Sequence, residues 1–131
     1  MPTITRFEDL EIWQKARTLS YEIFKYSREG GFKRDYKLID QINAASGSIM
    51  DNISEGFERS SRLEFINFLT YAKGSTGEVK SQLIRALDRK YLDQEKFSYF
   101  YGYADELTKQ ITSFISYLNK SNIKGQKFKN R

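Results

Sequence analysis

The stretch that decides the fold covers residues 37–87 and reads KLIDQINAASGSIMDNISEGFERSSRLEFINFLTYAKGSTGEVKSQLIRAL. Its apolar residues recur every three or four positions, which is the spacing of a helix that buries one face. One apolar stripe runs from Leu38 to Ile53, and a second runs from Phe65 to Leu87. A polar stripe lies beside each of them. The pattern therefore predicts two long helices that bury their apolar faces against each other.

A further helix is predicted before this hairpin. It covers residues 8–28 and ends at Gly30 and Gly31, because glycine readily adopts the left-handed conformation of a C-terminal cap. Asp35 is expected to cap the second helix. We expect that helix to end one residue before Gly56, which would act as a left-handed stop or as a kink shortly before one.

The second half of the chain has matching signals. Ser61 and Glu64 form a capping box for a helix that continues to Arg89. Asp93 is expected to cap a last helix, whose apolar residues keep the helical spacing to Asn119. Strand signals are absent. Because short connections make sequential helices neighbours, the sequence predicts an all-α fold, an antiparallel up-down-up-down four-helix bundle.

The chain is expected to form one domain with a tail. Residues 1–119 supply one bundle core, since a chain of 131 residues with 39% hydrophobic content has no room for a second. Residues 120–131 are polar and lysine-rich, and we expect them to be disordered. Neither a secretory signal nor a membrane-spanning run is present, so the sequence predicts a cytoplasmic protein without membrane contact.

Small, polar and aromatic residues follow one another in a characteristic order over most of the chain. They are Phe7, Asp9, Leu10, Trp13, Gln14, Lys15 and Ala16 before the hairpin, and Gln41, Ala44, Ala45, Ser48, Ile49, Asn52, Ile53, Glu55, Gly56, Arg59, Phe65, Phe68, Leu69, Ala72, Gly74, Ser75 and Glu78 within it. This order resembles the signature of the bacterial four-helix bundle protein family. Its members are also named ribosomal RNA intervening-sequence proteins, after reading frames found in inserts of large-subunit ribosomal RNA genes.

The resemblance implies an assembly and a class of partner. Similar proteins form homopentamers, which are rings of bundles around a central channel. A related branch, to which the likeness is distant, is the accessory subunit of the reverse transcriptase of diversity-generating retroelements; that branch is basic and binds nucleic acid. The family name itself records a gene location and no reaction.

The chain contains neither cysteine nor histidine. Their absence excludes disulfides, thiolate nucleophiles, imidazole bases and nearly all zinc chemistry. The remaining carboxylates, lysines and tyrosines show no arrangement that marks a catalytic site. We therefore expect no enzyme activity, no cofactor, no metal and no small-molecule substrate.

Basic residues are concentrated in the tail and in two clusters on the body. The formal net charge is +5, and the tail holds five basic residues and no acid, so residues 1–119 balance at 17 basic against 17 acidic. Such clusters can neutralise RNA or DNA phosphates, although a basic cluster is more often a solvated surface. The candidate nucleic-acid-binding residues are Lys33, Arg34, Lys37, Arg85, Arg89 and Lys90 on the body, and Lys120, Lys124, Lys127, Lys129 and Arg131 in the tail.

The polar stripes of the hairpin predict a structural hydrogen-bonded network, because buried amides, hydroxyls and carboxylates require partners. Antiparallel geometry is expected to bring Gln41 near Ser75 and Glu78. It is expected to bring Glu55 near Arg59 or Arg62. The members of this network are Gln41, Ser48, Asn52, Glu55, Ser75 and Glu78.

The alternative reading of the polar stripe is an iron–carboxylate centre formed by Glu55, Glu64 and Glu78. Bundles of that kind rely on a Glu-x-x-His motif, and this chain has no histidine. The structural network is therefore the favoured interpretation.

Some apolar residues fall outside the core stripes and are expected to point outward. Rows of isoleucine and aromatic residues on a surface usually mark contact with another chain, so the sequence predicts a homo-oligomer. These residues are Ile39, Met50, Phe57, Ile66, Ile84, Tyr99, Tyr103 and Tyr117. The alternative is that some of them are half-buried edges of the bundle.

Two functions remain open from the sequence. The first is a non-catalytic, oligomeric nucleic-acid-binding or accessory protein, pentameric by resemblance, that holds phosphates with its tail and basic edges. The second is a protein–protein interaction scaffold that does not bind nucleic acid. Salt-dependent retention on immobilised RNA separates the two.

Overall fold

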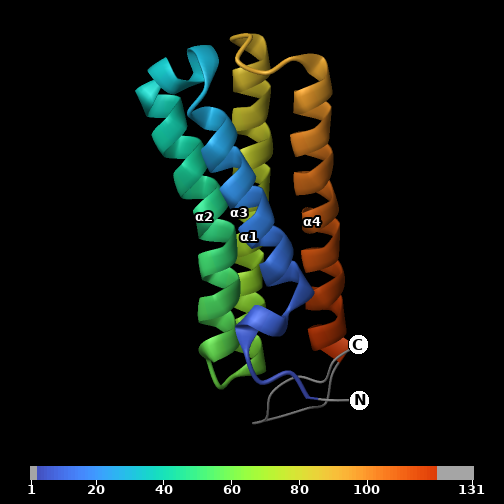
Figure 1. Ribbon diagram of the computed structural model, residues 1–131. Coiled ribbons are helices and arrows are strands. Elements are labelled where there is room, and N and C mark those ends of the chain that lie inside the picture. The colour runs from blue at the N-terminus through green and yellow to red at the C-terminus, as the bar shows by residue number, and fades with distance from the viewer. Residues whose placement is uncertain (1–2, 121–131) are drawn as a thin grey trace.

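The structure is a computed structural model that describes residues 3–120. It contains four α-helices lying side by side, with one short 3-10 helix before the first and another after it (Figure 1). The α-helices are α1 (Glu11–Ser27), α2 (Tyr36–Glu58), α3 (Arg62–Asp88) and α4 (Gln94–Lys120), and the 3-10 helices are η1 (Phe7–Asp9) and η2 (Gly30–Arg34).

The four helices close into a bundle. Each packs against its neighbours in the chain, and α1 also packs against α4. Successive helices run in opposite directions, so the start of α1 and the end of α4 lie at one end of the bundle (Figure 1). The α1–α2 and α3–α4 connections lie at the opposite end, which is called the connection end below. The structure confirms the predicted all-α, antiparallel up-down-up-down four-helix bundle.

The three predicted N-caps are confirmed. The side chains of Asp35, Ser61 and Asp93 each accept a hydrogen bond from the backbone N–H three residues later, at 3.2, 3.3 and 2.7 Å. These bonds satisfy amide groups that have no partner within the first turn of a helix. Gly30 is in the left-handed region with φ of 58°, as its position after α1 suggested.

Gly56 is not a left-handed stop, and the expected end of α2 one residue before Gly56 is wrong. The glycine lies shortly before the end of the helix, as the alternative expectation placed it. The helix continues to Glu58, and Gly30 is the glycine with a positive φ among residues 3–120. Gly56 is needed for a different reason, because α3 passes directly over it. A Cβ atom at Gly56 would lie 2.6 Å from the Cβ of Phe68 and 2.9 Å from the Cδ1 of Phe65.

The core contains a cluster of aromatic rings at the end where α2 meets α3. Phe65 contacts Phe57 edge-on with ring centroids 5.9 Å apart, and Phe114 of α4 with centroids 5.6 Å apart. Phe57 is fully buried, so the expectation that it points outward is wrong. The cause is the longer α2, since Phe57 follows Ile53 by four residues and therefore continues the same apolar stripe.

The other residues expected to point outward divide into two groups. Ile84 and Tyr99 are exposed. The remainder are partly buried against the core; they are Ile39, Met50, Ile66, Tyr103 and Tyr117. Among residues 3–120, no helix has both the length and the apolar character needed to cross a bilayer.

Candidate nucleic-acid interface

The two basic clusters of the body meet at the connection end of the bundle. Phe32 in η2 is buried, and its ring stacks on the ring of Tyr91 with centroids 5.3 Å apart. Gly31 lies against the same ring, because a Cβ there would be 3.4 Å from the Cδ1 of Tyr91. This packing brings Lys33 and Arg34 to the same end as Lys90, although more than fifty positions separate them in the chain.

The carboxylate of Asp35 lies at this end, and it is already paired with other side chains of the protein. Its Oδ2 accepts hydrogen bonds from the Arg89 guanidinium at 2.7 Å and the Tyr91 hydroxyl at 3.0 Å. Burial alone would raise the pKa of Asp35, but the hydrogen bonds from the Leu38 N–H, Tyr91 and Arg89 together lower that pKa below its ordinary value. The carboxylate therefore stays ionised and holds the two connections together.

The six basic residues predicted for the body differ in whether their side chains already have a partner within the protein. Arg89 forms the ion pair with Asp35, and Arg85 donates a hydrogen bond to the Gln41 amide oxygen at 3.1 Å. The other four are exposed and have no side-chain partner among residues 3–120, which leaves them free to bind an external anion. They are Lys33, Arg34, Lys37 and Lys90.

Lys90 occupies an unusual backbone position at the end of α3. Its φ is 63°, and its N–H and that of Tyr91 donate to the carbonyls of Leu87 and Ala86, both at 2.9 Å. This is a Schellman cap, in which the left-handed position is usually glycine. A lysine there costs about 1 kcal/mol of backbone strain. The result is a cation at the tip of the α3–α4 connection.

The connection end has further basic side chains beyond the two sequence clusters, and its charge contrasts with that of the rest of the bundle. Residues 25–37 and 85–96 contain nine basic and five acidic side chains, whereas the rest of residues 1–119 contains eight basic and twelve acidic. Lys25, Arg28 and Lys96 were missed as site residues because they lie inside a helix or directly after one, outside the two clusters in sequence. The alternating helix directions were the signal that could have found them.

The polar network forms in part. Asn52 donates to the Ser48 carbonyl at 2.9 Å and to the Ser48 hydroxyl at 3.0 Å. Ser75 of α3 donates to the same hydroxyl at 3.1 Å, so these three residues link α2 to α3. Gln41 is not beside Ser75 and Glu78, and this expectation is wrong, because its partner is Arg85. Glu78 is exposed.

The carboxylates considered for a metal centre do not converge. Glu55 and Glu64 both approach the Arg59 guanidinium, at 3.0 and 3.5 Å, so the expected pairing of Glu55 with Arg59 is present. Within the described part of the chain, no group of three or more acidic side chains is placed to hold a metal ion.

Of the five basic residues predicted for the tail, only Lys120 lies in the described part of the chain, as the last residue of α4. The α-helix therefore extends one residue beyond the predicted boundary at Asn119. Lys124, Lys127, Lys129 and Arg131 lie outside the described residues.

The sequence matches the family description "23S rRNA-intervening sequence protein" over residues 8–113, which is most of the chain. The chain belongs to this family. The resemblance inferred from the sequence is thereby confirmed, and the four helices described above are the fold of a 23S rRNA-intervening sequence protein.

A solved structure supports the same fold. It is the crystal structure of a protein of unknown function from the S23 ribosomal protein family of Bacteroides thetaiotaomicron, with a TM-score of 0.73 and 23% sequence identity, covering 79% of this chain and 97% of that chain. Identity at this level supports the fold alone. No curated protein matches the sequence.

Proposed function

We propose that this 23S rRNA-intervening sequence protein is a non-catalytic, homo-oligomeric nucleic-acid-binding or accessory protein. Its connection end would hold the phosphates of RNA or DNA, and the basic residues of 120–131 would add to this binding. A cytoplasmic location is part of the same proposal. The observation that carries it is the group of four free cations, Lys33, Arg34, Lys37 and Lys90, around a carboxylate that is already paired.

The electrostatics of the connection end favour an anionic partner. Asp35 is bound to Arg89 and Tyr91, so its charge offsets Arg89. The other charges of residues 25–37 and 85–96 are eight basic and four acidic, which leaves an excess of cations. Lysine and arginine side chains on an exposed surface bind phosphates mainly by releasing condensed counterions, which requires no base contacts. The strained Lys90 adds one such cation at the tip.

Assembly into a homopentamer belongs to the proposal and is supported by exposed apolar side chains. Large hydrophobic residues are exposed on α3, which carries three of the seven such residues in the described part of the chain. These three are Leu63, Tyr71 and Ile84. A contact between copies would cover them, and each copy would then bring its own cationic end to one assembly.

The decisive experiment compares two double variants that remove the same charge. Lys33→Gln/Lys37→Gln acts at the connection end, and Lys73→Gln/Lys109→Gln acts on exposed cations of α3 and α4. Binding of a labelled RNA would be measured by fluorescence anisotropy over a series of salt concentrations. We expect the first variant to lose affinity and to lower the salt slope by up to about 2, and the second to bind like the parent.

Equal loss in both variants would mean that binding has no preferred surface and would contradict the proposed site. If the parent itself binds no RNA or DNA at low salt, the nucleic-acid proposal fails. The protein–protein scaffold then takes its place, supported by the exposed apolar residues of α3.

A further inference from the structure

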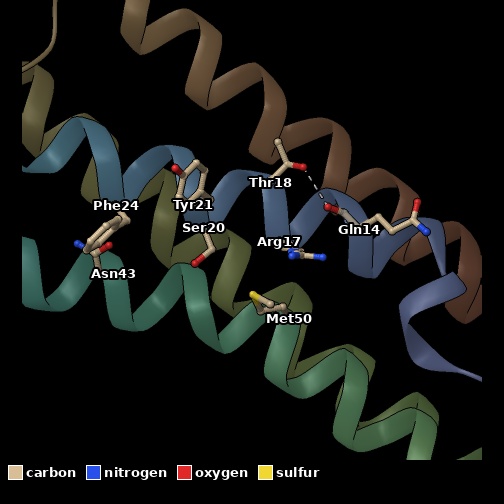
Figure 2. A pocket seen from close by; sticks show the side chains of 8 residues that line it. All are labelled: Gln14, Arg17, Thr18, Ser20, Tyr21, Phe24, Asn43 and Met50. Atoms are coloured by element: carbon tan, nitrogen blue, oxygen red, sulfur yellow. Dashed lines mark hydrogen bonds between the residues drawn. The ribbon is translucent and has the colours of Figure 1, made fainter.

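A groove runs along the outside of the bundle between α1 and α2, with a volume of about 730 Å³ (Figure 2). From α1 it is lined by residues that include Arg17, Tyr21 and Phe24, and from α2 by Asn43 and Met50. It ends at Phe24 and Asn43, in the half of α1 that leads to the connection end (Figure 2).

Small residues explain why the two helices leave this space. Ser20 lines the groove from α1. Gly47 falls on the same face of α2 as Asn43 and Met50, because it follows the first by four residues and precedes the second by three. A Cβ at Gly47 would have no atom within 4 Å. The glycine is therefore not required by close helix packing, and its missing side chain widens the groove.

Aromatic rings and cations alternate along the outer face of α1. The Arg17 guanidinium lies 5.7 Å from the centroid of the Trp13 ring, and the Lys25 ammonium lies 5.4 Å from that of Tyr21. The Arg28 guanidinium lies 5.0 Å from the ring of Phe24. Each cation follows its ring by four residues, so the pairs repeat along one face over about 22 Å of helix.

Two of the three rings in this row are exposed. Tyr21 is 60% exposed and Phe24 is 44% exposed, although both are large and apolar. None of the groove's lining residues in the described chain carries a carboxylate. Glu22 is the acid nearest in sequence to Tyr21, and its carboxylate accepts a hydrogen bond from the Tyr99 hydroxyl of α4 at 2.6 Å.

We infer that the α1–α2 groove binds single-stranded nucleic acid, with unpaired bases stacked on Tyr21 and Phe24. Phosphates would be held by Arg17 in the groove and by Lys25 and Arg28, which lie outside the groove lining next to these two rings. This inference rests on the proposed function and specifies its ligand. Flat rings between cations suit a strand with free base faces, because base stacking on aromatics tolerates any sequence. A duplex hides those faces and could use only the cations.

The charges favour this occupant over a second copy of the chain. Tyrosine, phenylalanine, methionine and arginine also occur at protein interfaces. A symmetric contact of this face with itself would, however, bring the two copies of Arg17 together without a carboxylate among the groove's lining residues to separate them. A single-stranded nucleic acid complements both the cations, through its phosphates, and the exposed aromatic rings, through its bases.

The test uses two labelled probes, a twelve-nucleotide oligouridine and a duplex RNA of equal length, with the full-length protein. We expect the parent to bind the single strand more tightly than the duplex. Tyr21→Ala/Phe24→Ala should lose about tenfold or more in affinity for the single strand and keep its duplex affinity. Tyr21→Phe/Phe24→Tyr should retain the parental affinity, since both rings remain.

A readout without mutation is ultraviolet cross-linking of the parent to a 4-thiouridine oligonucleotide, which should label peptides of α1. Labels confined to other helices would overturn the inference.

The possible failures can be told apart. If Lys33→Gln/Lys37→Gln weakens binding while Tyr21→Ala/Phe24→Ala binds the single strand like the parent, the groove inference is wrong and the proposed function stands. If the parent binds neither probe, the proposed function fails, and the groove inference fails with it. If the Tyr21→Ala/Phe24→Ala variant changes the mass of the assembly in light scattering, the groove is an interface between copies, which also overturns the inference.

Discussion

Gly56→Ala tests the closest approach between two helices in this bundle. The new Cβ would lie 2.6 Å from the Cβ of Phe68 and 2.9 Å from the Cδ1 of Phe65. The Phe65 ring can rotate, but the Cβ of Phe68 is fixed to the backbone of α3. Since carbon atoms pack at 3.5 Å or more, α2 and α3 would have to separate by about 1 Å at this point.

Two opposing contributions determine how much Gly56→Ala changes the free energy of unfolding. Replacing glycine with alanine inside a helix gains about 1 kcal/mol from the reduced backbone entropy of the unfolded chain. Overpacking costs about 1–3 kcal/mol, and more where the backbone must move. Because the contact is with a backbone-anchored atom in the main α2–α3 interface, we expect the cost to exceed the gain. The free energy of unfolding should fall by about 2 kcal/mol.

The assay is urea denaturation followed by circular dichroism, with Gly102→Ala as the matched control. Gly102 also lies inside a helix, but a Cβ there would meet no atom within 4 Å. This control should be more stable than the parent by about 0.5–1 kcal/mol. If Gly56→Ala proves as stable as Gly102→Ala, the close approach of α3 does not explain the glycine, and the reasoning is refuted.

Four further predictions follow from the same structure. Lys90→Gly should raise the free energy of unfolding by about 1 kcal/mol in thermal or urea melts while weakening RNA binding, because it relieves the left-handed strain and removes a cation. Asp35→Asn should lower stability by about 1–2 kcal/mol at neutral pH. Since the pKa of Asp35 is lowered in the folded state, this loss is complete above pH 3.8 and should shrink as the pH of the melt falls below that value. Size exclusion with light scattering should give a mass near five times 15.4 kDa, and a monomer at micromolar concentration would contradict the assembly. A chain ending at Asn119 should keep its fold and mass but show a shallower salt slope in filter binding, whereas unchanged affinity would leave the connection end as the binding surface.

Local signals in the sequence were sufficient for the starts of α2, α3 and α4. They were not sufficient for α1, which begins at Glu11 and not at residue 8, because Phe7–Asp9 form the separate helix η1. Asp35, Ser61 and Asp93 cap the helices that their positions predicted, because capping depends only on the next three residues. Gly56 shows the limit of such reasoning. A glycine required for a positive φ and one required for a close approach have the same sequence pattern, and only the position of α3 separates them.

The partner of Gln41 was missed because it depends on the register between two helices. Ser48 of α2 lies opposite Ser75 of α3. Gln41 is seven residues before Ser48. Because α2 and α3 are antiparallel, Gln41 therefore lies near the residue that is seven positions after Ser75. That level, at residue 82, is three residues from Arg85, the observed partner. It is about two turns from Ser75 and about one turn from Glu78, the two partners that were expected. Amphipathic stripes define which faces meet, but a helix can slide along its partner without changing its stripe.

The charge distribution shows why the candidate interface could be predicted only in part. Counted along the chain, residues 1–119 are neutral, and this sum suggested that the body contributes little apart from two short clusters. The fold divides the same charges unequally, with nine basic and five acidic residues in the segments at the connection end and eight and twelve elsewhere. A phosphate within a Debye length of that end responds to the local excess rather than to the sum. The binding surface of a bundle with alternating helices is therefore set by which helix ends share a side, a property that requires the topology before the charges can be counted.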